Sequence, residues 1–124
     1  MRISRERFEE LAFEIAEAIL AELQPDLRAE AETVILEIED RPTPEQIPGP
    51  GQTLLGLYEG VPLVQRHADA VLMQPDRITL FREPLQASAR TEVELRRHIR
   101  QTLIHELGHF FGFDEDELEE RGWG

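Results

Sequence analysis

The chain has 124 residues, of which 13 are basic and 26 acidic, so its net charge is −13. This length fits one domain with a single core over residues 1–124. An apolar content of 40% is typical of a folded globule rather than a disordered tail. Because the negative charge repels phosphate backbones and anionic lipids, we expect neither nucleic acid nor membrane partners.

The absence of cysteine and of long apolar segments excludes further kinds of site and of targeting signal. The sequence contains no cysteine, which excludes disulfides, a thiolate nucleophile and cysteine metal ligands. Residues 1–8 are charged and lack the apolar stretch of a secretory signal. No apolar run is long enough to cross a bilayer. We therefore expect a cytoplasmic protein.

The first part of the chain predicts a helix, a strand and a loop. Residues 4–23 have apolar side chains at helical spacing, with Ser4 as a favourable N-cap and Pro25 as the end. Residues 33–39 are rich in β-branched side chains and alternate in the manner of a strand, with Val34 and Ile38 on one face. Residues 41–51 contain four prolines and two glycines, which predicts an irregular loop.

The middle of the chain predicts three further strands. Residues 54–58 and 61–64 flank Glu59-Gly60, a dipeptide suited to a two-residue hairpin turn, so we expect these two segments to pair. Residues 77–82 alternate again and predict another strand, in which Ile78 and Leu80 share one face.

The last third predicts a long helix over residues 92–111. Thr91 and Glu94 have the spacing of a capping box, and apolar residues recur through the segment at helical intervals. Gly112 is suited to a left-handed C-terminal cap. The expected order is helix, strands, long helix and short tail helix, which is an α+β domain.

The long helix carries the sequence His105-Glu106-Leu107-Gly108-His109, which matches H-E-x-x-H. Residues four apart on a helix lie one turn apart on nearly the same face, so both imidazoles are directed at one place. Two such nitrogens suit zinc, and Glu106 is placed to act as general base on a water at that site. The pattern predicts a Zn²⁺-dependent hydrolase in which His105 and His109 are ligands.

Residues 105–115, HELGHFFGFDE, resemble the extended zincin motif H-E-x-x-H-x-x-G-x-x-(H/D/E). With the leading helix, LLGLYEGVPL at residues 54–63 and PDRITLFREPL at residues 75–85, they resemble the compact bacterial zincin-like metallopeptidases. The resemblance implies a minimal zincin-like fold, a small twisted mixed sheet packed on an N-terminal helix and the HExxH helix. It also implies zinc ligands His105, His109 and Glu115, Glu106 as base, and a peptide or protein substrate.

The residues themselves leave three candidates for the third ligand, namely Asp114, Glu115 and Asp116. Fifteen residues follow His109 in this sequence, and Gly112 lets the chain turn sharply after the helix. With Glu117 three residues on, Asp114 has the pattern of the N-cap of a short tail helix, which would occupy its carboxylate. We therefore expect Glu115 to be the ligand.

Other polar residues have a structural and a functional interpretation. Tyr58 either packs in its strand or hydrogen-bonds an oxyanion, a role that zincins give to a tyrosine or histidine. His98 precedes His105 by seven residues, about 10 Å along the helix, so it cannot bind the same ion and is expected at the rim of a cleft or in packing. Arg96, Arg97 and Arg100 form a basic stripe that is expected to be solvated and to pair with acidic residues.

The alternative to a peptidase is a zinc-binding or protein-interaction module without enzymatic activity on the same scaffold. Glu106 argues against this alternative, because a purely structural zinc site needs no base and closes its fourth coordination position.

Overall fold

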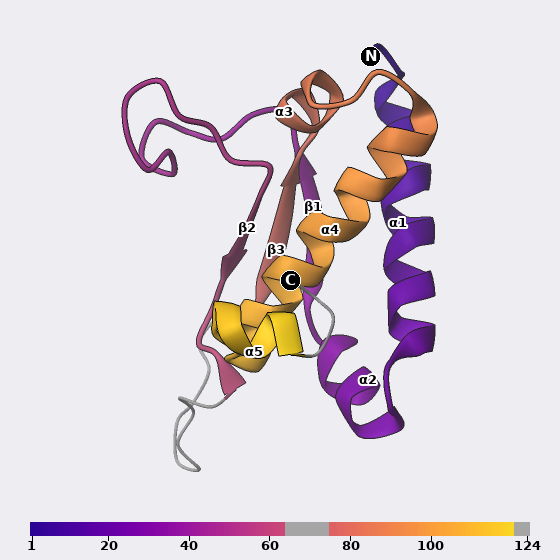
Figure 1. Ribbon diagram of the computed structural model, residues 1–124, viewed down its shortest axis with the longest axis vertical. Coiled ribbons are helices and arrows are strands. Elements are labelled where there is room, and N and C mark those ends of the chain that lie inside the picture. The colour runs from indigo at the N-terminus through magenta and orange to yellow at the C-terminus, as the bar shows by residue number, and fades with distance from the viewer. Residues whose placement is uncertain (64–74, 121–124) are drawn as a thin grey trace.

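The protein combines helices with a small sheet, as the sequence predicts. The computed structural model describes residues 1–63 and 75–120, apart from the side chains of Glu115 and Leu118. The elements follow in the order α1 (Arg5–Glu22), α2 (Pro25–Ala31), β1 (Ile35–Glu39), β2 (Gly56–Glu59), β3 (Arg77–Phe81), α3 (Arg82–Ala87), α4 (Glu92–Phe111) and α5 (Glu115–Glu120) (Figure 1). No described helix is both long and apolar enough to cross a membrane.

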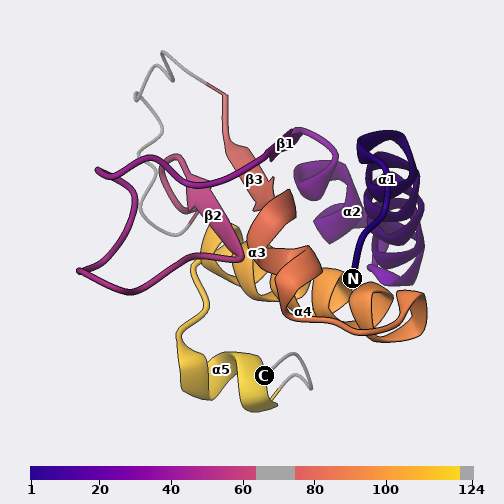
Figure 2. The same ribbon diagram turned by 90° about the horizontal axis from the view of Figure 1, so that it is seen from above.

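Helix α4 is the centre of the core, because it packs against α1 as well as β2 and β3 (Figures 1 and 2). The largest fully buried side chains come from α1, the sheet, α3 and α4: Phe8, Leu11, Ile19, Leu80, Phe81, Leu85, Leu95, Ile99 and Phe110. Burial of each such side chain stabilises the fold by about 1.5–3 kcal/mol. The apolar face of α4 is therefore held on two sides, which fixes the helix that carries the H-E-x-x-H motif.

Both long helices begin at the expected N-caps, and α4 ends at the expected glycine. The Ser4 hydroxyl accepts a hydrogen bond from the Arg7 amide at the start of α1. The Thr91 hydroxyl accepts one from the Glu94 amide at the start of α4, while the Glu94 carboxylate accepts from the Arg90 amide rather than from that of Thr91. Helix α4 ends at Gly112, whose φ of 85° is left-handed.

Exposed ion pairs join α1 to α4. Arg96 lies 3.3 Å from Glu14, and Arg100 lies 2.6 Å from Glu22. These pairs confirm the expected role of Arg96 and Arg100 as partners of the acidic residues. Each exposed pair contributes at most about 1 kcal/mol, so packing rather than charge holds the two helices together.

In the described part of the chain the sheet has the strand order β1-β3-β2. Strand β1 is parallel to β3, with Ile38 opposite Leu80, and β2 is antiparallel to β3, with Tyr58 opposite Ile78. Residues 78–81 of the central strand β3 are all buried, so side chains on both of its faces are covered. The mixed sheet of the expected fold is confirmed.

The expected hairpin is wrong. Strand β2 pairs with β3 and not with residues 61–63. Residues 61–63 are not part of a strand, and Val64 lies outside the described residues. The pairing places β3 between β1 and β2, and the turn signal at Glu59-Gly60 is too local to indicate this distant partner.

Two short helices were not expected from the sequence. The sequence pattern favours Pro25 as the end of the first helix, but Pro25 also occupies the first turn of α2, where its missing amide costs no hydrogen bond. Arg82 was placed at the end of a strand, whereas it begins α3. Neither segment is long enough to show a helical repeat.

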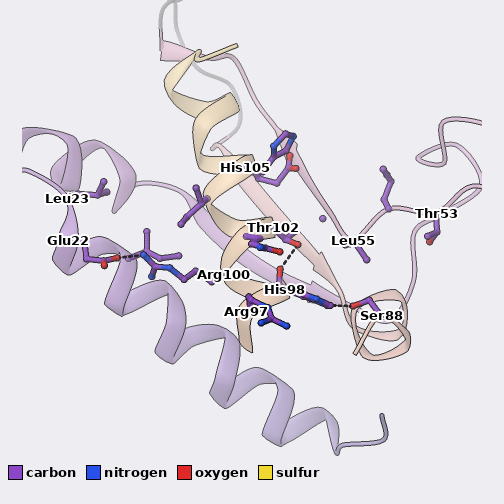
Figure 3. A pocket seen from close by; sticks show the side chains of 16 residues that line it. Glu22, Leu23, Thr53, Leu55, Ser88, Arg97, His98, Arg100, Thr102 and His105 are labelled. Carbon is purple, nitrogen blue, oxygen red and sulfur yellow. Dashed lines mark hydrogen bonds and ion pairs between the residues drawn. The ribbon is translucent and has the colours of Figure 1, made fainter. Parts of the chain in front are cut away.

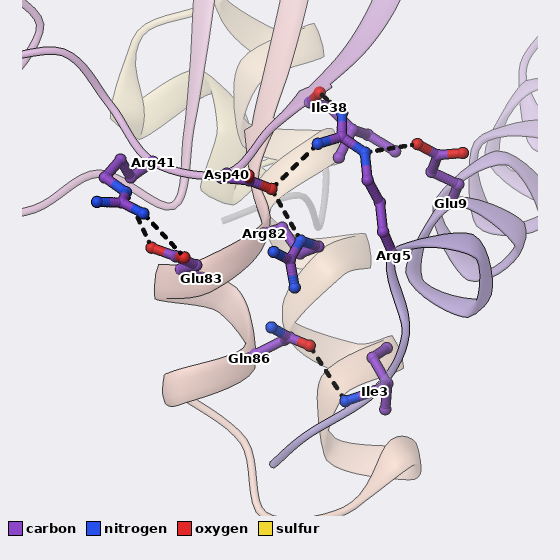
Figure 4. A network of polar contacts seen from close by, with 9 residues as sticks. All are labelled: Ile3, Arg5, Glu9, Ile38, Asp40, Arg41, Arg82, Glu83 and Gln86. Carbon is purple, nitrogen blue, oxygen red and sulfur yellow. Dashed lines mark hydrogen bonds and ion pairs between the residues drawn. The ribbon is translucent and has the colours of Figure 1, made fainter.

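A polar network holds α3 and β1 at the start of α1 (Figure 4). The Asp40 carboxylate lies 3.0 Å from Arg82 Nε and 3.1 Å from Arg5 Nη1, and Arg5 Nη2 donates to the Ile38 carbonyl at 2.8 Å. The hydrogen bond from Arg82, helped by the positive charges of Arg82, Arg5 and Arg41, lowers the pKa of Asp40 below its ordinary value.

Candidate metal centre

His105 and His109 present their imidazoles to one point beside α4. Their Nε2 atoms are 3.1 Å apart, and their rings are nearly perpendicular, at 85°. Two nitrogens bound to one tetrahedral zinc ion at 2.0–2.1 Å would be about 3.4 Å apart. The observed separation is close to this value, so the pair fits a shared metal ion with little movement.

Glu106 is buried next to the two histidines. Ligand atoms of His105, Glu106 and His109 all lie within 4.8 Å of one another, which makes these residues a group able to hold a metal. Glu106 Oε1 accepts a hydrogen bond of 2.9 Å from the backbone amide of Tyr58 in β2. The carboxylate is therefore oriented by the sheet as well as by its own helix.

The contact between Glu106 and Tyr58 was not anticipated from the sequence. The two residues are 48 positions apart, and the donor is a backbone amide, which every residue except proline has. No residue pattern could have revealed it.

Close approach of β2 to α4 makes that contact possible. A Cβ atom at Gly56 would lie 2.6 Å from Thr102 Cγ2 on α4 and 3.2 Å from the Thr79 carbonyl oxygen on β3. Since ordinary contacts between carbon atoms are 3.5–4.0 Å, only glycine fits here without displacing a neighbour. Gly56 thereby brings the amide of Tyr58, two residues on, within reach of Glu106.

The side chain of Tyr58 is engaged in packing. Its hydroxyl donates to Asp76 Oδ1 at 2.7 Å, and its ring makes an edge contact with Phe110, with centroids 6.0 Å apart. Asp76 is itself buried. This geometry corresponds to the structural interpretation of Tyr58.

Of the three candidates for a third ligand, Asp114 has a carboxylate that is already used as the cap of the tail helix. Its Oδ1 accepts from the Glu117 amide at 2.8 Å, while the Glu117 carboxylate lies 3.4 Å from the Asp114 amide. This is the reciprocal cap expected at the start of the tail helix. Asp116 is exposed, and Glu115 begins α5 with a side chain outside the described part of the structure. The ligand role of Glu115 stays a prediction.

A groove of about 1070 Å³ opens at His105 and Glu106 (Figure 3). One face of α4 lines it, with residues 53–56 and the end of α1 as further lining. His98 also lines the groove, and its Nδ1 lies 2.8 Å from the Ser88 hydroxyl. His98 is thus at the rim of a cleft, as expected, rather than at the metal centre.

A comparison with protein families agrees with this geometry. A family model described as zincin-like metallopeptidase matches residues 31–123, three quarters of the chain. A comparison with curated proteins gave no match. The matched region contains the whole sheet, α4 and the His105-Glu106-His109 group, whereas α1 precedes it. The chain therefore belongs to the zincin-like metallopeptidase family.

Proposed function

We propose that this protein is a zinc-dependent peptidase that hydrolyses peptide bonds with Glu106 as general base. The observation that carries the proposal is the position of Glu106, which lies beside the two imidazoles and is oriented by the Tyr58 amide. A site that only bound zinc for stability would gain nothing from a carboxylate held in this way.

His105, His109 and a third ligand would hold the ion. When bound, zinc would lower the pKa of a water molecule and polarise the carbonyl of the scissile bond. Glu106 accepts the proton of the attacking water and passes it to the amine nitrogen of the leaving product.

The outer edge of β2 supports a peptide as the substrate. The Phe81 amide donates to the Leu55 carbonyl, and hydrogen-bonded pairs in an antiparallel ladder recur at every second residue. By this register the backbone groups of Gly56 and Tyr58 are directed away from β3, and the Tyr58 amide reaches Glu106. Because Glu106 takes the Tyr58 amide, an extended substrate that pairs with this edge would use the backbone groups of Gly56 and would pass directly by the site.

The decisive test is Glu106→Gln with zinc content and peptide cleavage measured on the same preparations. We expect about one zinc per chain in both proteins, and cleavage of a mixed peptide library only by the wild type. Retention of most of the wild-type activity by the variant would contradict the role of Glu106. A wild type that binds zinc and cleaves no peptide would instead favour the non-enzymatic binding module.

We further propose Glu115 as the third ligand, because the carboxylate of Asp114 already caps α5. Glu115→Ala should weaken zinc binding by orders of magnitude. Asp114→Ala should keep zinc affinity and lower the free energy of unfolding by about 1 kcal/mol through the lost cap. Titration with a zinc-competing chelator and urea unfolding separate the two effects, and the reverse ranking would assign the ligand to Asp114.

A further inference from the structure

The groove at the metal centre extends along α4 well beyond the catalytic residues (Figure 3). Arg97, Gln101 and His105 follow one another at intervals of four on the face of α4 that lines it. Arg97 precedes His105 by eight residues, which is about 12 Å along the helix. An extended peptide advances about 3.3 Å per residue, so Arg97 lies three to four substrate residues from the bond that would be cleaved.

Arg97 is the less compensated of the two arginines that line this groove. The other lining arginine, Arg100, is paired with Glu22 at 2.6 Å. Among the described residues Arg97 has one ion pair, a distant one at 3.9 Å from Glu94, and its side chain is 61% exposed. One oxygen of Glu94 accepts from the Arg90 amide in addition. A positive charge is therefore available to a ligand in the groove of a strongly acidic protein.

His98 adds a polar group beside Arg97. The Ser88 hydroxyl donates to the Leu85 carbonyl at 2.7 Å, so its contact with His98 Nδ1 requires the hydrogen to be on the ring nitrogen. This bond fixes the orientation of the imidazole at the groove wall. Arg97 and His98 thus form a polar end to the groove, opposite the end that carries His105.

We propose that this end of the groove is a subsite for an acidic side chain of the substrate, with Arg97 as the residue that selects it. The inference rests on the proposed peptidase function and specifies its substrate class. The substrate is an extended peptide with Asp or Glu three to four residues from the scissile bond. The net charge of −13 does not cancel the attraction, because charges farther than about 8 Å are largely screened at physiological ionic strength.

The test uses peptides of one sequence in which a single position carries Glu, Gln or Lys in turn, scanned along the peptide. Cleavage by the zinc-loaded wild type gives the position relative to the scissile bond, and fluorescence anisotropy with zinc-loaded Glu106→Gln gives Kd without turnover. We expect Glu at one position, three to four residues from the cleaved bond, to bind about two- to fivefold more tightly than Gln, as for an exposed ion pair. Arg97→Gln, added to Glu106→Gln, should abolish the preference, and Arg97→Glu should reverse it in favour of Lys.

Arg90→Gln is the matched control, because it removes the same charge from an exposed residue outside the groove. It should leave the preference unchanged, and circular dichroism should show that all variants are folded. The inference is overturned if the charge of the peptide never affects Kd, if Arg90→Gln alters the preference as much as Arg97→Gln, or if no acidic peptide binds. Absence of cleavage with a binding preference that depends on Arg97 would refute the peptidase function and leave the acidic subsite supported.

Discussion

Gly56→Ala tests whether the close approach of β2 to α4 organises the site. The added methyl group would lie 2.6 Å from Thr102 Cγ2, so strand or helix would have to retreat by about 1 Å to restore an ordinary contact. Overpacking of this kind costs about 1–3 kcal/mol of unfolding free energy. The same displacement would lengthen the 2.9 Å hydrogen bond between the Tyr58 amide and Glu106.

Urea unfolding measures the free energy of unfolding of four variants. These are Gly56→Ala, Thr102→Ser, the double variant and the control Gly49→Ala. Thr102→Ser removes Cγ2 and keeps the hydroxyl that donates to the His98 carbonyl, at a cost of about 1 kcal/mol for the lost methyl group. In the double variant with Gly56→Ala we expect a favourable coupling of about 1 kcal/mol or more. Rescue should be incomplete, because the Thr79 carbonyl oxygen would still lie 3.2 Å from the new methyl group.

Gly49→Ala is the control, since the nearest atoms to a Cβ there, in the Gln52 side chain, are 3.8 Å away. It should be neutral or stabilise the protein by up to about 1 kcal/mol, because alanine restricts the unfolded chain. Gly56→Ala should also reduce peptide cleavage while zinc stays bound. A variant as stable as the wild type, or no coupling with Thr102→Ser, would refute the proposed role of Gly56.

Three further predictions concern single residues. Tyr58→Phe should lower the free energy of unfolding in urea by about 1–3 kcal/mol, because buried Asp76 loses a hydrogen bond. Peptide cleavage should persist, and its loss at unchanged zinc content would assign Tyr58 to the oxyanion. Gly112→Ala should cost about 1–2 kcal/mol in the same assay, because alanine is strained at a φ of 85°. The lowered pKa of Asp40 predicts a stabilisation that is complete above its ordinary pKa of 3.8 and is lost as the pH falls through the lower folded value. Asp40→Asn should therefore destabilise the protein at pH 7 more than at pH 2, and an equal loss at both would contradict this role.

The sequence by itself determined the two long helices and the H-E-x-x-H motif. Apolar spacing and the caps at Ser4, Thr91 and Gly112 placed α1 and α4 within about a residue of their observed ends. These signals are local, since a helix forms its hydrogen bonds within one turn. The four-residue spacing of His105 and His109 likewise needs only helical geometry to bring both rings together.

The tertiary structure decided the partners of the strands and the surroundings of Glu106. Strand β2 ends at a turn signal that suits a hairpin, yet it pairs with β3, about twenty residues further along the chain. Helices α2 and α3 are too short for their own sequences to show a repeat, and packing and end contacts such as that of Arg82 with Asp40 hold them in place. The bond from the Tyr58 amide to Glu106 exists only because the bare backbone of Gly56 lets β2 lie against α4. Contacts between segments distant in sequence depend on packing of the whole core, and no local pattern of residue types encodes them.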